Sequence, residues 1–88
     1  MNKITFSRNG WEDYLYWQKQ DKKTLKRINL LINDISRNPY IGIGKPEMLT
    51  GKLFGHCSRR IDEKNRLVYI IERDSIEIIQ CKEHYDDK

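Results

Sequence analysis

The alternation of apolar and polar positions predicts a strand at the start of the chain and a helix directly after it. Residues 2–6, Asn-Lys-Ile-Thr-Phe, alternate with the period of two that is typical of a half-buried strand. Ser7 can cap the helix that follows, because its hydroxyl can accept a hydrogen bond from a backbone N–H of the first turn. Residues at i, i+3, i+4 and i+7 share one side of a helix, and here they are Trp11, Tyr14, Leu15 and Gln18. We expect this side to face the core.

The next segment predicts a second helix, from an N-cap at Asp21 to about Arg37. Its inner face is expected to consist of four aliphatic residues, Leu25, Ile28, Ile32 and Ile35. Pro39 ends this helix, because the residue before a proline disfavours helical geometry. Only a few residues join the two helices, so they should form an antiparallel pair.

Three further strands are predicted at roughly residues 56–61, 66–72 and 76–82, joined by short polar turns into an antiparallel meander. The middle strand is apolar on both faces at residues 67–71, so it should lie centrally, with helices covering one side. Residues 40–55 contain four glycines and predict a long loop, which at this length is usually either functional or disordered. The predicted fold is α+β, with the order β-α-α-β-β-β and two N-terminal helices on one face of an antiparallel sheet.

Length and composition limit the class of protein. A chain of 88 residues predicts a single domain spanning residues 1–88. No apolar run approaches the ~20 residues that a membrane-spanning helix needs, and the N-terminus lacks a signal-peptide stretch, so we expect a cytoplasmic protein without a membrane partner. Cys57 and Cys81 are too few for a disulfide framework. One strand should separate them, which puts them ~9–10 Å apart from two strand spacings and beyond disulfide reach. We expect buried thiols.

Positive charge is concentrated in the middle of the chain. Residues 19–66 carry twelve Lys or Arg against five acids, whereas residues 67–88 carry three against six. A basic segment suggests a polyanionic partner, because Lys and Arg release counterions from phosphates. For the cluster between Lys19 and Arg27, a solvated helix face is an equally good interpretation.

Two groups of side chains could carry acid–base or phosphate chemistry. Glu47, in Gly44-Lys45-Pro46-Glu47, is held by a proline next to a lysine and could be a general base, although most loop glutamates are only solvated. Arg59 and Arg60 precede Arg66 on the next strand. Adjacent strand residues point to opposite faces, so only one of the pair can share a face with Arg66. The sequence leaves open which one, and whether its partner is a phosphate or a cross-strand acid.

His84 and Tyr85 follow the last strand and could supply an acid and a stacking ring. A soft-ligand set of His56, Cys57, Cys81 and His84 is also present, but structural zinc sites usually show two properly spaced pairs, so no metal or cofactor is expected. Motifs for nucleotide binding, zinc peptidases and nucleophile elbows are missing from the sequence. Glu, Arg and His side chains suit metal-free RNA cleavage, in which a base activates the ribose 2′-hydroxyl and an acid protonates the leaving oxygen.

The sequence closely resembles the YoeB toxins, members of the RelE-like group of bacterial toxin–antitoxin ribonucleases. The matching stretches are Trp11-Glu-Asp-Tyr-Leu-Tyr-Trp-Gln18, Gly44-Lys-Pro-Glu47, Ser58-Arg-Arg-Ile61, Arg66-Leu-Val-Tyr69 and His84-Tyr85. The resemblance implies the RelE-like fold, and it implies Glu47 as general base, His84 as general acid, Arg66 as phosphate stabiliser and Tyr85 as the residue that orients the nucleotide. The residues expected to bind RNA are Lys45, Arg59 and Arg60.

The resemblance also implies partners and an activity. YoeB-like toxins cut mRNA in the ribosomal A site, are inhibited by a YefM-like antitoxin with a disordered C-terminal segment, and can form homodimers. Two departures stand out: Thr50 replaces a lysine of some family members, and residues 86–88 extend past Tyr85. Two alternatives remain, a non-catalytic RNA- or ribosome-binding module and a RelE-fold toxin with a target other than RNA. The Glu–Arg–His set favours the nuclease.

Overall fold

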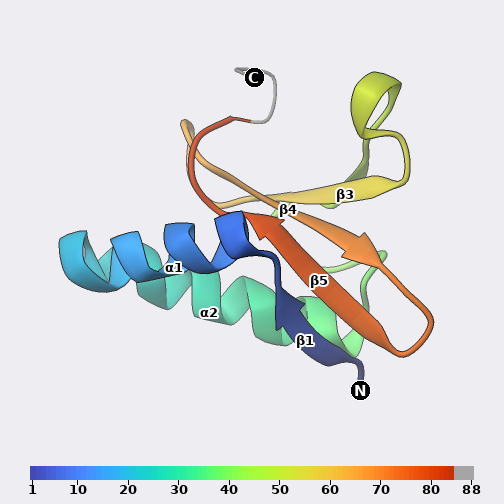
Figure 1. Ribbon diagram of the computed structural model, residues 1–88, viewed down its shortest axis with the longest axis horizontal. Helices are drawn as coiled ribbons and strands as arrows, with labels where there is room; N and C mark the ends of the chain where they lie inside the picture. The colour runs from blue at the N-terminus through green and yellow to red at the C-terminus, as the bar shows by residue number, and fades with distance from the viewer. Residues whose placement is uncertain (85–88) are drawn as a thin grey trace.

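The computed structural model describes residues 1–84 and places two helices against one face of a five-stranded sheet (Figure 1). The elements are β1 Lys3–Phe6, α1 Arg8–Gln20, α2 Lys22–Arg37, β2 Glu47–Met48, the 3-10 helix η1 Gly51–Leu53, β3 His56–Arg60, β4 Arg66–Ile71 and β5 Ser75–Gln80. The strands lie in the order β1-β5-β4-β3-β2. All neighbouring strands are antiparallel except β1 and β5, which run parallel. The α+β prediction is therefore confirmed, with one parallel pair and the short strand β2 as additions.

Side-chain caps set the starts of both helices, as the sequence predicts. The Ser7 hydroxyl accepts a hydrogen bond from the Gly10 N–H at 3.0 Å. The Asp21 carboxylate accepts bonds from the first turn of α2, and the hydroxyl and N–H of Thr24 lower the pKa of this carboxyl. Only Asp21 separates the helices, and they run antiparallel beneath the sheet (Figure 1).

The predicted inner face of α1 is confirmed only at Tyr14, which packs against the core, and is wrong at Trp11 and Leu15. Trp11 and Leu15 remain 46% and 39% exposed, whereas the buried residues of α1 are Gly10, Asp13 and Trp17. The reason is a close backbone approach that apolar periodicity does not reveal. A Cβ on Gly10 would collide with the carbonyl oxygen of Ile78 in β5, so this turn of α1 packs directly on the strand.

The core lies between the helices and the inner face of the sheet. From α2 it includes Ile28 and Ile35 as predicted, and also Leu31, while Leu25 and Ile32 are only partly buried. The other fully buried apolar residues facing it include Leu67, Tyr69, Ile76 and Ile78. The central position predicted for β4 is confirmed, because it has two strands on each side.

Alternation along β3 divides its side chains between two faces. Cys57 belongs to the core and Arg59 bonds to α2, so both face the helices. His56, Ser58 and Arg60 therefore point away from the helices. Register places Glu47 opposite Ser58, and Arg66 opposite Arg60. Cross-strand partners share a face, so Glu47, Ser58, Arg60 and Arg66 define what we call the outer face.

Cys57 and Cys81 are both free and buried, and β4 lies between the strand of Cys57 and the end of β5, as expected. Burial raises the pKa of both thiols, to about 12 for Cys81. Within residues 1–84, neither helix is long and apolar enough to cross a bilayer.

Candidate active site on the outer face of the sheet

Glu47 is positioned by a strained turn and by β2. Gly44 and Lys45 both have positive φ, +82° and +51°, and a Cβ on Gly44 would lie 2.7 Å from the Leu31 side chain. The Gly44 carbonyl accepts a hydrogen bond from the Arg60 N–H, which fastens the turn to β3. Left-handed geometry at a non-glycine residue costs roughly 1–3 kcal/mol, and such strained residues tend to cluster at functional sites. Lys45 lies in this turn, two residues before Glu47, and its side chain is exposed.

Arg66 reaches Glu47 across the intervening strand β3. Their Nη1 and Oε1 atoms are 3.9 Å apart, with side chains that are 22% and 53% exposed. Because β2 and β4 flank β3, both side chains must extend over β3 to meet. An ion pair of this length and exposure contributes only ~0–1 kcal/mol. The Glu47–Arg66 pair therefore brings a carboxylate and a guanidinium close together, but it holds the two side chains only weakly.

Arg60, and not Arg59, shares the outer face with Arg66, which resolves the ambiguity left by the sequence. The prediction that Arg59 binds RNA is wrong for this structure, because Arg59 is fully buried on the helix side. All five of its N–H groups have partners, namely Tyr69 Oη, Asp34 Oδ2 and the carbonyls of Ile43, Asn38 and Ile41.

The partners of Arg59 give it a structural role. Its hydrogen bond holds the pKa of Asp34 below the usual range, against the opposing effect of burial. Asp34 also accepts from the Ile43 N–H at 3.0 Å. Arg59 and Asp34 together hold the backbone of residues 38–43, which leads into the turn before Glu47.

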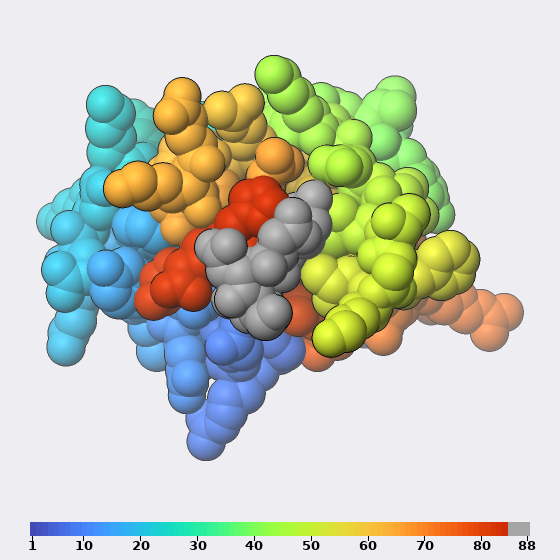
Figure 2. Space-filling model, turned by 90° about the horizontal axis from the view of Figure 1, so that it is seen from above, coloured from blue at the N-terminus to red at the C-terminus, as the bar shows by residue number. Residues whose placement is uncertain are grey.

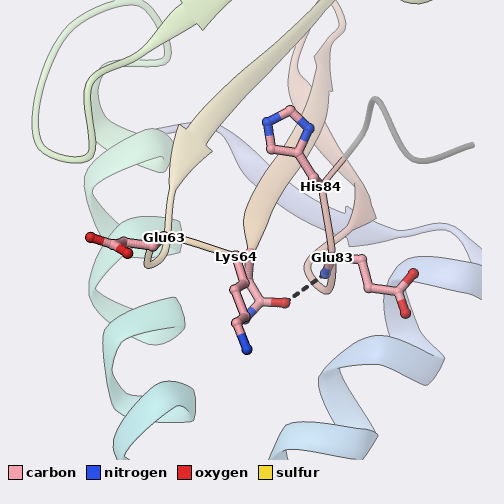
Figure 3. Close-up of a pocket in the computed structure, with 5 residues that line it drawn as sticks. Glu63, Lys64, Glu83 and His84 are labelled. Atoms are coloured by element: carbon pink, nitrogen blue, oxygen red, sulfur yellow. Dashed lines mark hydrogen bonds between the residues drawn. The ribbon is translucent and has the colours of Figure 1, made fainter.

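Backbone hydrogen bonds tie the turn after β5, which precedes His84, to the start of β4. The Arg66 N–H donates to the Glu83 carbonyl at 3.1 Å, and the Glu83 N–H donates to Asn65 Oδ1 (Figure 3). His84 is half-buried and lines a surface pocket with residues 63–65 and Glu83, its ring pointing away from Lys64 (Figure 3). In Figure 2 this end of the chain (red) lies between the β3–β4 turn (orange) and the loop around residues 45–55 (yellow-green). Tyr85 lies outside the described residues.

The soft-ligand set does not converge on one point. His56 and Cys57 are adjacent strand residues on opposite faces of β3, and burial keeps both thiols protonated at neutral pH. Residues 1–84 contain no group of three or more His, Cys, Asp or Glu side chains arranged to hold a metal ion.

The sequence analysis did not identify Ser58 as a site residue. It lies on the outer face next to Glu47, and its hydroxyl is fully buried with no hydrogen-bond partner within residues 1–84. The only sequence signal was its place at the start of the Ser-Arg-Arg-Ile stretch. Its burial and lack of a partner depend on tertiary packing.

The fold is shared with a class of small bacterial toxins. A YoeB/ParE toxin from Agrobacterium tumefaciens superposes with a TM-score of 0.92 at 40% identity, over 94% of this chain and 99% of that protein. Staphylococcus aureus YoeB, solved as a dimer and in a heterotetrameric complex with YefM, superposes with a TM-score of 0.87 at 49% identity, covering 96–97% of this chain and 98–99% of that one.

The sequence matches the family model described as the YoeB-like toxin of bacterial type II toxin–antitoxin systems, over residues 6–85. Toxin YoeB from Streptomyces coelicolor is 53% identical over 83 residues, covering 94% of this chain and 99% of the relative. The chain therefore belongs to the YoeB-like toxin family.

Proposed function

We propose that this toxin is an endoribonuclease that cuts mRNA on the ribosome by attack of a ribose 2′-hydroxyl on the adjacent phosphate. The observation that supports this most directly is the gathering of Glu47 and Arg66, 3.9 Å apart, on the outer face, with Arg60 opposite Arg66. A base and cationic groups that stabilise the phosphorane are two of the contributions that a protein can make to phosphodiester transesterification, and a general acid for the leaving oxygen is the third.

The proposed roles combine the positions of Glu47, Arg66 and Arg60 on the outer face with the roles that the family resemblance implies. Glu47 takes the proton of the 2′-hydroxyl, and the 2′-oxygen then attacks phosphorus. Arg66 and Arg60 stabilise the negative charge that gathers on the phosphorane. His84 protonates the departing 5′-oxygen. The products are a 2′,3′-cyclic phosphate and a 5′-hydroxyl, with no metal needed for any proton transfer.

Three residues complete the proposed site. Lys45 and Arg60 contact the RNA backbone, and Tyr85 orients the nucleotide by stacking. In the free protein Arg66 is paired with Glu47. An incoming phosphate competes for the guanidinium, so that substrate binding itself releases the carboxylate to act as a base. Because the pair is weak, this exchange costs little.

The proposed partner in the cell is a YefM-like antitoxin, because Staphylococcus aureus YoeB was solved in complex with YefM. We expect an acidic segment that folds on binding, since residues 19–66 carry an excess of seven positive charges, twelve minus five. A homodimer is proposed for the free toxin, as for the same relative. We expect a small gene encoded beside this one to supply that partner, so its co-expression should relieve growth arrest, and unrelieved arrest would contradict the assignment.

The cleavage mechanism is tested in a purified translation system. The pure protein is added to ribosomes stalled on a defined message, and new RNA ends are mapped. We expect cutting in the A-site codon, and no cutting when the nucleotide 5′ to the scissile phosphate carries a 2′-deoxy sugar. Cutting of the deoxy message would refute 2′-hydroxyl attack. Arrested translation with an intact message would instead indicate a non-catalytic ribosome-binding toxin.

A further inference from the structure

The outer face contains a buried hydroxyl that the free protein does not use. Ser58 has no exposed surface, and its Oγ has no hydrogen-bond partner within residues 1–84, not even the carboxylate of its neighbour Glu47. Burial of an unpaired hydroxyl lowers stability, so most buried side-chain polar atoms have a partner. An unpaired one at a candidate site suggests that its partner is the substrate.

Strand register fixes where this hydroxyl lies. Ser58 pairs with Glu47 on β2 and with Val68 on β4. Directly opposite residues have Cβ atoms about 4.5–5.5 Å apart. Arg60 follows two residues later on the same face, opposite Arg66. Ser58 therefore lies beside the proposed base, one step along the strand from the proposed phosphate-binding arginines.

The Glu47–Arg66 pair lies on the same face of the sheet as the buried hydroxyl of Ser58. The two side chains meet over β3, the strand that carries Ser58. The pair is long and partly exposed. For this hydroxyl to reach the substrate, a phosphate that draws Arg66 away from Glu47 must also open the space above Ser58.

We propose that Ser58 is a further catalytic residue, whose hydroxyl donates a hydrogen bond to the ribose 2′-oxygen as Glu47 removes its proton. This inference rests on the proposed function. The 2′-proton moves to Glu47, the bond from the 2′-oxygen to phosphorus forms, the bond to the 5′-oxygen breaks, and His84 protonates that oxygen. Ser58 keeps its own proton throughout. It stabilises the charge that develops on the 2′-oxygen, which a preorganised donor does most effectively in a desolvated site.

The experiment compares Ser58→Ala with Ser36→Ala, a matched change at a second buried serine. Ser36 lies in α2 on the helix side of the sheet, and its Oγ donates to the Asn33 carbonyl at 2.7 Å. Ser58→Ala removes an unpaired hydroxyl, so its melting temperature should be unchanged or higher, while its single-turnover cleavage rate falls about 10- to 100-fold. Ser36→Ala should melt lower and cleave at the normal rate.

A second measurement tests the atom that Ser58 contacts. Ribosomes programmed with the uncleavable 2′-deoxy message lack the 2′-oxygen, so they should bind the wild type and Ser58→Ala equally well. Weaker binding of Ser58→Ala would place its contact elsewhere on the RNA and overturn the proposal. So would a normal cleavage rate in Ser58→Ala, or a lower melting temperature, which would mean a structural partner. If the wild type cuts nothing, it is the proposed function that fails.

Discussion

Arg59 and Arg60 are neighbours in sequence, yet the structure predicts opposite consequences for the same substitution. Arg59→Met should destabilise the protein, because it removes a fully buried guanidinium whose five N–H groups all have partners. Arg60→Met should leave stability nearly unchanged and reduce RNA cleavage, because its side chain lies on the outer face opposite Arg66. The two variants are matched in chemistry and differ only in the side of β3 that they change.

The magnitude follows from what Arg59 leaves behind. Removal of one partner of a buried ion pair costs about 3–5 kcal/mol. The Asp34 carboxylate and the three loop carbonyls would each lose a donor, although Asp34 is 30% exposed and can be partly rehydrated. For a domain of this size, each kcal/mol lowers the melting temperature by about 4–8 °C, so a fall of roughly 12–40 °C is expected.

The assay is thermal and urea unfolding followed by circular dichroism, with cleavage measured on the same samples at a temperature where both variants are folded. If Arg59→Met melted at a temperature close to that of the wild type but no longer cleaved RNA, the structural role of Arg59 would be refuted. Arg59 would then be an RNA-binding residue, as the sequence analysis expected. A large loss of stability in Arg60→Met would refute the strand register.

Removal of Arg59 should also change how stability depends on pH. The Arg59 hydrogen bond lowers the pKa of Asp34 below its ordinary value of 3.8. A lowered folded-state pKa contributes stability that is fully present above the unfolded value and is lost as the pH falls below it, through the folded value. The wild type should therefore lose stability below about pH 4 more steeply than Arg59→Met does.

Three further predictions concern the site and its supports. Glu47→Ala and Arg66→Ala should each lose about 10²–10⁴-fold in cleavage rate with little loss of stability, since loss of an acid–base or charge-stabilising group has that effect; near-normal cutting by Glu47→Ala would make it an ordinary loop carboxylate. Deletion of residues 86–88 should preserve cleavage, whereas a chain ending at Glu83 should be inactive but folded. If the chain ending at Glu83 still cleaved RNA, His84 and Tyr85 would have no part in the mechanism. Gly44→Ala should lower stability by about 1–3 kcal/mol through overpacking, measured by urea unfolding, and an unchanged midpoint would contradict the tight turn.

Much of the candidate site was visible in the sequence because its parts lie in short matching stretches. Glu47, Arg66 and His84 were identified from residue type and position, and the structure brings Glu47 and Arg66 together. Their assignment to roles still came from the family resemblance. Arg59 was assigned wrongly, because a guanidinium in a basic stretch has the same sequence signature whether it bonds to Asp34 or to a phosphate.

The two helices likewise differ in how well the sequence predicted their buried faces. The inner face of α2 followed from periodicity, apart from Leu31. The inner face of α1 did not, because Gly10 packs on the carbonyl of Ile78 and so turns Asp13 and Trp17 inward. A close approach of two backbones depends on residues 68 positions apart in the chain, and no local pattern encodes it.

The sequence by itself determined the two helices and the strands β1, β3, β4 and β5, but not β2 or η1, because capping and apolar periodicity act between residues a few positions apart. Ser7 and Asp21 start the helices, and the apolar stretch of β4 requires a central place in the sheet. Tertiary structure alone decided which side chains share the outer face. A shift of one residue in strand register moves every side chain to the opposite face, and the two-residue strand that carries Glu47 forms a ladder only by pairing with β3.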